Sequence, residues 1–227
     1  MYGMYGYGYG YGLDPTIILV LIGVALSLWA QGRVNSTFSR YSRVRSMTGM
    51  TGAEAARRLL NAQGIYDVTV QQIAGELTDH YDPRTKTVNL SQSVYGATSV
   101  AAIGVAAHEC GHAMQDNEGY APLRFRSALV PVANFGSSLS WPLILLGLVF
   151  GGLGSPLVEI GILMFSLAVL FQLVTLPVEY NASARAVRLL DAQGILAGEE
   201  VNGTRKVLNA AALTYVAAAA TSILQLL

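Results

Sequence analysis

Two histidines four residues apart are the part of this sequence best suited to chemistry. His108 and His112 occupy positions i and i+4, and on an α-helix such positions lie on one face about one turn apart. Two imidazoles placed in this way can bind one metal ion. Glu109 is offset from His108 by roughly 100° around the helix, so its carboxylate flanks the metal without needing to bind it. The stretch therefore predicts a metal site with a general base beside it.

The order His-Glu-x-x-His is typical of zinc metallopeptidases, in which the histidines bind zinc and the glutamate is the general base. The ordinary alternative is a helix that carries two surface or core histidines. Cys110 lies roughly 200° around the helix from His108, so we expect a small packed residue rather than a ligand. The motif predicts one zinc ion per chain.

A catalytic zinc ion needs a third protein ligand and one open position for water. Glu179 has the best context among the acidic residues, because small residues follow it at i+3, i+4 and i+7, namely Ala182, Ser183 and Ala186. These positions share its helix face and would allow a close approach to the motif helix. The alternative is a solvated carboxylate near the membrane. His80, the only other histidine, could contact substrate or lie in a polar hairpin.

Capping residues and turns outline the region around the motif. Ser99 should cap a helix from Val100 to about Gln115 that carries the motif. Thr51 and Glu54 form a capping box, which starts a helix that Gly64 ends. Three strands are expected, at residues 67–73, 77–81 and 86–90, and the last two should form a β-hairpin. The similar segments 58–65 and 188–195 are both interpreted as helix ends closed by glycine.

The composition indicates a membrane protein. The chain is 52% hydrophobic and only 12% charged, against about 25% charged in an ordinary soluble domain. The apolar residues form runs long enough to cross a bilayer. We predict a first transmembrane helix at residues 13–32 and a transmembrane hairpin of two helices at residues 128–177. The net charge of zero argues against a nucleic-acid partner.

The remaining segments complete the predicted organisation. Residues 1–12 are almost entirely tyrosine and glycine, which predicts a flexible tail. Residues 33–127 form the region of the zinc motif, and residues 178–227 should form C-terminal helices that complete the zinc site. Within the latter, residues 207–227 are long enough to span a membrane but contain many alanines and polar residues. We therefore expect this part to pack on the catalytic domain at the membrane surface.

The basic residues predict the orientation in the cell membrane. No lysine or arginine precedes the first apolar run, and the turn of the hairpin has none. Arginines follow the first run and flank the hairpin on both sides. By the positive-inside rule the N-terminus should face outward and the zinc motif should be cytoplasmic.

Several motifs together resemble a known family. His108-Glu109-x-x-His112, followed by Glu179-x-x-Ala182 on a second helix, resembles the gluzincin metallopeptidases, and within them the membrane-embedded heat-shock protease and CAAX-protease branch. The Tyr-Gly-rich start and the segments 77–83, 107–113 and 177–179 are more closely similar to the bacterial YugP-type neutral zinc metallopeptidases. In one departure, Ser183 stands where the heat-shock branch has aspartate. Asn181 or Ser183 itself would then have to orient a zinc ligand.

The resemblance implies a zinc site and a fold. His108, His112 and Glu179 would be the zinc ligands, and Glu109 the catalytic base. The expected fold is a mostly α integral membrane protein of the α+β type. It would combine about three transmembrane helices with a gluzincin-like cytoplasmic zinc domain that contains a small β-hairpin.

The expected function is a membrane-bound zinc-dependent endopeptidase, in which Glu109 takes a proton from zinc-activated water. Candidate donors to the oxyanion are His80, Tyr180, Tyr215 and Arg185, and the sequence does not choose among them. The expected partners are a protein or peptide substrate and the lipid bilayer, and a homo-oligomer or a membrane partner protein stays open. The main alternative is a catalytically inactive zinc-binding membrane scaffold, which would need neither Glu109 nor an open coordination position. A transporter is weaker, because the hairpin has few polar residues.

Overall fold

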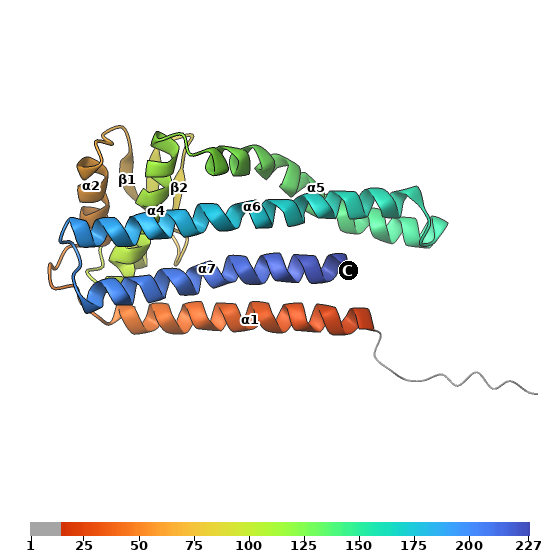
Figure 1. Cartoon of the computed structure of the whole chain (residues 1–227), viewed down its shortest axis with the longest axis horizontal. Helices are drawn as coiled ribbons and strands as arrows, with labels where there is room; N and C mark the ends of the chain where they lie inside the picture. The colour runs from red at the N-terminus through yellow and green to blue at the C-terminus, as the bar shows by residue number, and fades with distance from the viewer. Residues whose placement is uncertain (1–14) are drawn as a thin grey trace, which may run out of the picture.

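Long helices dominate the computed structural model, which describes residues 15–227 (Figure 1). In this range four helices are long and apolar enough to cross a membrane, by length and composition. They are α1 (Pro15–Ser42), α5 (Ala121–Gly151), α6 (Pro156–Ala192) and α7 (Glu199–Leu226). The shorter elements gather beside one end of these helices. The flexible tail expected at residues 1–12 lies outside the described residues.

A small three-stranded sheet accompanies the shorter helices. The strands follow the order β1-β3-β2, with β1 parallel and β2 antiparallel to β3. The predicted hairpin is therefore confirmed, but its first strand begins at His80 instead of Leu77. Leu77 has a φ of 54°, a left-handed conformation that is incompatible with an extended strand. The short elements are α2 (Gly52–Ala62), β1 (Thr69–Ile73), β2 (His80–Asp82), β3 (Thr87–Ser91), α3 (Gln92–Tyr95) and α4 (Val100–Asn117).

The long helices extend further than the apolar runs that predicted them. α1 continues through polar residues to Ser42, and α6 continues through Pro177 to Ala192. A proline inside a helix removes one backbone hydrogen bond, and α6 tolerates this loss. Residue 177, predicted as the end of the membrane hairpin, is consequently in the interior of a helix. The same helix carries both the apolar run and Glu179.

α7, expected to pack on the catalytic domain, does so over its first half only. Its first half packs on α4, where Thr204 contacts Gly104. Its far end instead lies against the apolar part of α1: the Thr221 hydroxyl donates to the Gly23 carbonyl at 3.0 Å and lies 3.2 Å from the Ser27 hydroxyl. Because α7 is a fourth candidate for crossing the membrane, the expected count of three transmembrane helices is not confirmed.

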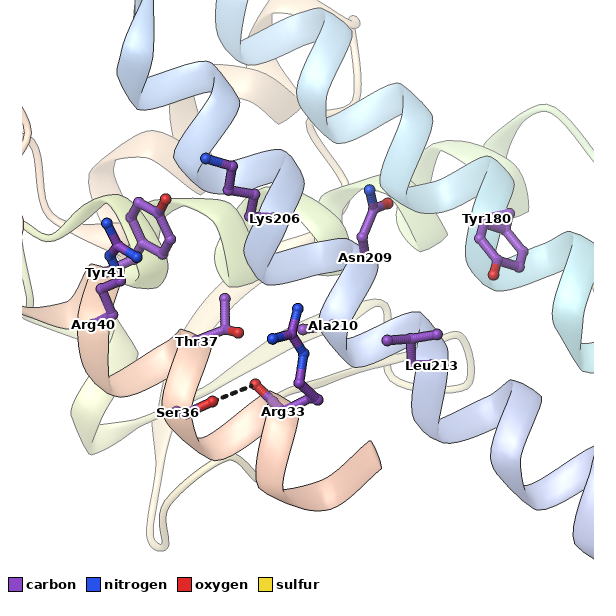
Figure 2. Close-up of a pocket in the computed structure, with 10 residues that line it drawn as sticks. All are labelled: Arg33, Ser36, Thr37, Arg40, Tyr41, Tyr180, Lys206, Asn209, Ala210 and Leu213. Atoms are coloured by element: carbon purple, nitrogen blue, oxygen red, sulfur yellow. Dashed lines mark hydrogen bonds between the residues drawn. The ribbon is translucent and has the colours of Figure 1, made fainter. Parts of the chain in front are cut away.

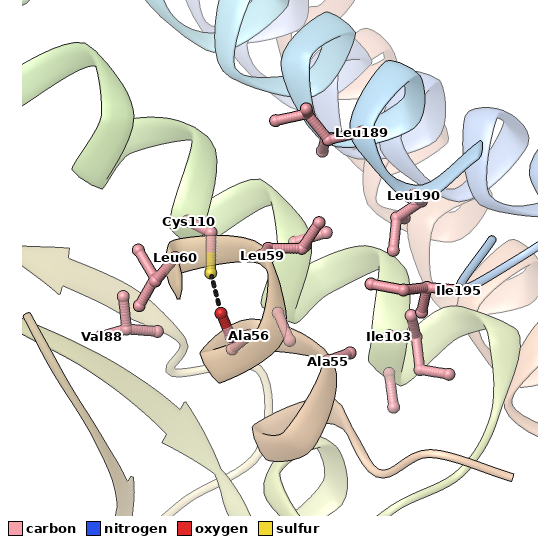
Figure 3. Close-up of a cluster of buried hydrophobic side chains, with 14 of the residues drawn as sticks. Ala55, Ala56, Leu59, Leu60, Val88, Ile103, Cys110, Leu189, Leu190 and Ile195 are labelled. Carbon is pink, nitrogen blue, oxygen red and sulfur yellow. Dashed lines mark hydrogen bonds between the residues drawn. The ribbon is translucent and has the colours of Figure 1, made fainter. Parts of the chain in front are cut away.

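The motif helix α4 lies at the centre of the hydrophobic core. Its alanine-rich first turns are fully buried, and the core includes residues of α2, the sheet and the end of α6. Figure 3 shows Cys110 of α4 pointing toward α2, where its sulfur lies 3.6 Å from the Ala56 carbonyl. Cys110 is thus a packed core residue, as its position on the helix predicted. Ser99 caps α4 and the capping box of α2 is present, as predicted.

The two similar segments end α2 and α6 in the same way. Gly64 and Gly194 have φ values of 69° and 60°, and the next residue in each case donates to a carbonyl five residues back, Ile65 to Leu60 and Ile195 to Leu190. This geometry favours glycine because a left-handed residue follows the last helical turn. The predicted glycine-closed helix ends are confirmed.

α4 and α6 approach each other closely at Gly111. A Cβ atom added to Gly111 would lie 2.6 Å from the Ala182 carbonyl oxygen. A backbone oxygen cannot move aside as a flexible side chain can. The small residues Gly111 and Ala182 therefore set the distance between the two helices.

We predict that Gly111→Ala forces α4 and α6 apart. Overpacking of this kind typically costs about 1–3 kcal/mol, so thermal unfolding of the purified protein should shift to lower temperature. The displacement should also lower the zinc content. The matched control is Gly96→Ala, since nothing lies within 4 Å of a Cβ atom at Gly96. An unchanged unfolding temperature and zinc content in Gly111→Ala would contradict the close approach.

Candidate metal centre

The structure brings His108 and His112 of α4 to Glu179 of α6. The Glu179 Oε2 atom lies 3.2 Å from His108 Nε2 and 3.6 Å from His112 Nε2. Four-coordinate zinc with bonds of about 2.0–2.1 Å separates its ligand atoms by roughly 3.4 Å. The residue types and the distance of Glu179 from each histidine therefore fit a zinc ion held by these three side chains, whose ligand atoms all lie within 4.8 Å of one another.

Hydrogen bonds at the other ring nitrogen orient both histidines. His108 Nδ1 lies 3.1 Å from the Ser183 hydroxyl, and His112 Nδ1 lies 3.0 Å from Gln115 Oε1. With Nδ1 engaged in this way, Nε2 of each ring is left to face the metal position. Ser183 thus contacts a candidate ligand directly in the place where the heat-shock branch has aspartate.

Gln115 and Asn181 extend this network between the helices. Gln115 Nε2 donates to the Val178 carbonyl and to Asn181 Oδ1, both at 2.9 Å. Gln115 is fully buried, so it needs such partners. Gln115 was not among the residues predicted from the sequence. Its position three residues after His112, on the same helix face, was an available signal.

Arg126 is a second residue that the sequence analysis did not select. Its Nη1 atom donates to Glu179 Oε1 at 3.0 Å, and Glu179 is only 2% exposed. A buried carboxylate is costly unless it is paired and hydrogen-bonded. Arg126 satisfies one carboxylate oxygen and leaves the other facing the two histidines. No local pattern connects Arg126, near the start of α5, with a glutamate on α6.

Glu109 is buried next to the three candidate ligands. Burial is the main cause that raises the pKa of Glu109 to about 7; nearby His108 opposes the shift and the Glu179 carboxylate adds to it. A carboxylate with a pKa near the operating pH is suited to accept a proton and return it. Glu109 follows His108 directly on α4 and is not part of the group of three side chains that could hold a metal ion.

Two cavities meet at this cluster. One of about 270 Å³ extends toward Gln31 and Val34 of α1, and one of about 330 Å³ extends toward β2 and the start of α5. The residues that line both cavities are Asp79, His108, Glu109, Glu179 and Tyr215. Glu109 therefore borders both cavities.

The expected oxyanion donors separate into two groups. Tyr215 lines both cavities, and His80 lines one of them. Tyr180 and Arg185 do not reach the cluster: Tyr180 lines a different cavity, and Arg185 donates to Glu118 at 2.6 Å and to Asn181 at 2.8 Å. Both residues are on α6, where they lie roughly 100° and 240° around the helix from Glu179, so they point away from the histidines.

Long apolar helices around such a cluster suit a metallopeptidase of the membrane. Comparison with known proteins leads to the same class. Residues 16–227 match the family described as "Putative neutral zinc metallopeptidase", and the chain belongs to this family. It is 50% identical over 211 residues, 93% of each chain, to "Putative membrane protease YugP" of Bacillus subtilis (strain 168). No solved structure matches the chain.

These comparisons confirm the resemblance to the YugP-type neutral zinc metallopeptidases. With the four apolar helices they place the chain among multi-pass membrane proteins. The family also implies zinc, in agreement with the donor set of His108, His112 and Glu179.

We predict that the purified protein contains one zinc ion per chain and that Glu179→Ala loses most of it, because two histidines alone hold zinc weakly. Metal analysis of the purified variants measures this. Glu159→Ala is the matched control, since Glu159 is an exposed glutamate in the first turn of the same helix. Equal zinc content in both variants would remove Glu179 from the site.

Proposed function

We propose that this protein is a membrane-bound zinc-dependent endopeptidase with Glu109 as its general base. The observation that carries the proposal is the buried Glu109 carboxylate, which borders both cavities beside the ligand cluster. An inactive zinc-binding scaffold would require the three ligands alone. It would have no use for a buried carboxylate that substrate can reach.

The residues of the chain have distinct roles in this proposal. A zinc ion bound by His108, His112 and Glu179 supplies Lewis acidity, which polarises a carbonyl group and acidifies water. Glu109 accepts the proton of the attacking water and delivers it to the leaving amine. Tyr215 is the favoured donor to the oxyanion, because it lines both cavities.

The edge of the sheet provides a place for the substrate backbone. β2 is the last strand in the order β1-β3-β2. The larger of the two cavities is bordered by His80, Tyr81, Pro83 and Arg84. An extended peptide can add to such an edge as a further strand. His80 is held in place there by Thr78 and Asn89, at 2.9 and 3.2 Å. The peptide would then run past Glu109.

We also propose an arrangement in the cell membrane. The arginines after the apolar part of α1 and on both sides of the hairpin support a cytoplasmic zinc region and an outward N-terminus. Residues 33–127 would then be cytoplasmic, with the α5–α6 turn outside. The contact of Thr221 with Gly23 supports α7 as a fourth span, which returns the C-terminus to the outside.

Accessibility in intact cells tests this topology. In a Cys110→Ser background, Gly152→Cys should react with a membrane-impermeant thiol reagent, and Arg84→Cys should react only after lysis. A C-terminal tag should be accessible from outside. Labelling of Arg84→Cys but not of Gly152→Cys would reverse the orientation, and a tag reachable only after lysis would return α7 to the membrane surface.

Glu109→Gln separates the enzyme from the scaffold. Glutamine keeps the size and helix propensity but cannot accept the proton, so cleavage of an unfolded casein-like substrate should fall at least about a hundredfold. Zinc content should stay at the parent value, because Glu109 is not a ligand. Chelation should abolish the parent activity.

The control is Glu199→Gln, an exposed glutamate in the first turn of α7, which should cleave like the parent. Activity of Glu109→Gln within a factor of a few of the parent would refute the role of Glu109. A parent that binds zinc but cleaves none of the tested peptides would favour the scaffold.

A further inference from the structure

A cavity of about 690 Å³ lies apart from the candidate metal centre, between α1, α6 and α7 (Figure 2). None of its lining residues borders the two cavities at Glu109. α7 packs against both α1 and α6. It separates them and forms the floor of the cavity, with Ala210 and Leu213 at its surface.

Three cations line this cavity. Arg33 and Arg40 come from α1, seven residues apart on one helix face, and Lys206 comes from α7. Figure 2 shows the three side chains around the same hollow. No aspartate or glutamate lines it, and neutral polar groups of Thr37 and Asn209 lie between the cations.

No carboxylate of the described residues pairs with the cations of this cavity. Of the five ion pairs among residues 15–227, none includes Arg33, Arg40 or Lys206. The Arg40 guanidinium lies only over the Tyr41 ring, at 5.7 Å. Like charges around one hollow repel each other, and a bound anion relieves that repulsion. Arginine presents a planar fork of donors that matches a phosphate group.

The position of the cavity in the fold indicates where the phosphate comes from. Arg33 follows the apolar run of α1 after Gln31 and Gly32, and Leu213 lies at the cavity floor on α7, beyond the last basic residue of that helix, Lys206. The cavity thus lies where two candidate membrane spans leave the bilayer, at the end that carries α2, the sheet and α4 (Figure 1). Lipid phosphates occupy this depth, and basic pockets between membrane helices bind their head groups.

We propose that this cavity binds the phosphate of an anionic phospholipid, with Arg33, Arg40 and Lys206 as its ligands and the acyl chains directed along α7 past Leu213. A free phosphate has the same head-group chemistry but no use for the apolar side of the cavity. The site does not depend on peptidase activity, so binding alone tests it.

The test measures lipid retained by the full-length protein, by native mass spectrometry from mixed micelles of phosphatidylglycerol and phosphatidylcholine. The parent should retain phosphatidylglycerol in clear preference. Loss of each cation should weaken the preference about fivefold, so Arg33→Gln/Lys206→Gln should lose it roughly 25-fold. Arg43→Gln/Arg45→Gln removes the same charge outside the cavity and should behave like the parent.

A second variant fills the cavity and keeps its charge. Asn209→Trp should also reduce retention of phosphatidylglycerol, and it decides the question if the double variant unfolds. Three results would each overturn the proposal. The parent could retain the two lipids equally, or Arg43→Gln/Arg45→Gln could lose as much phosphatidylglycerol as Arg33→Gln/Lys206→Gln. The third is full retention of phosphatidylglycerol by Asn209→Trp. Displacement of the lipid by millimolar inorganic phosphate would overturn the lipid assignment in favour of a free anion.

Discussion

The close packing of α4 on α6 is the constraint on which the candidate site depends. Gly111 and Ala182 allow backbone contact between these helices, and only at that separation does Glu179 reach both histidines. A buried carboxylate would normally oppose such packing. Here Arg126 and the histidines satisfy it, so the polar cluster and the small-residue contact stabilise the same arrangement. The residue immediately before His112 is a glycine for this structural reason.

The network around the histidines links the metal position to the membrane helices. Ser183 and Glu179 belong to α6, and Gln115 bonds to the α6 backbone at Val178. α6 is also one of the helices apolar enough to cross a membrane. A shift of α6 would therefore move one ligand and two hydrogen-bond partners together. The proposed lipid site adjoins the turn of α6 that carries Glu179. The next residue, Tyr180, lines the cavity of that site, and Glu179 itself belongs to the candidate metal cluster.

The basic residues divide into two groups with different environments. Arg126 bonds to the buried carboxylate of Glu179 and Arg185 to the exposed carboxylate of Glu118, and both pairs join residues of different helical segments. Arg33, Arg40 and Lys206 face a cavity without carboxylates. In the sequence both groups contribute equally to the positive charge near the apolar runs. Only their partners in three dimensions distinguish a structural ion pair from a site that can accept an external anion.

Local rules determined much of this protein from the sequence alone. Helical periodicity placed His108, Glu109 and His112, and capping chemistry placed the starts of α2 and α4 and the glycine-closed ends, because each depends on residues only a few positions apart. Glu179 was found from its small neighbours at helical spacing. Tertiary structure decided the rest. Arg126 bonds to a residue 53 positions away, and Gln115 bonds to residues 63 and 66 positions away. Tyr180 and Arg185 point away from the candidate metal position, and α7 lies along α1. These contacts and side-chain directions depend on how helices distant in the sequence pack together. Short-range spacing carries no information about the rotation of one helix against another.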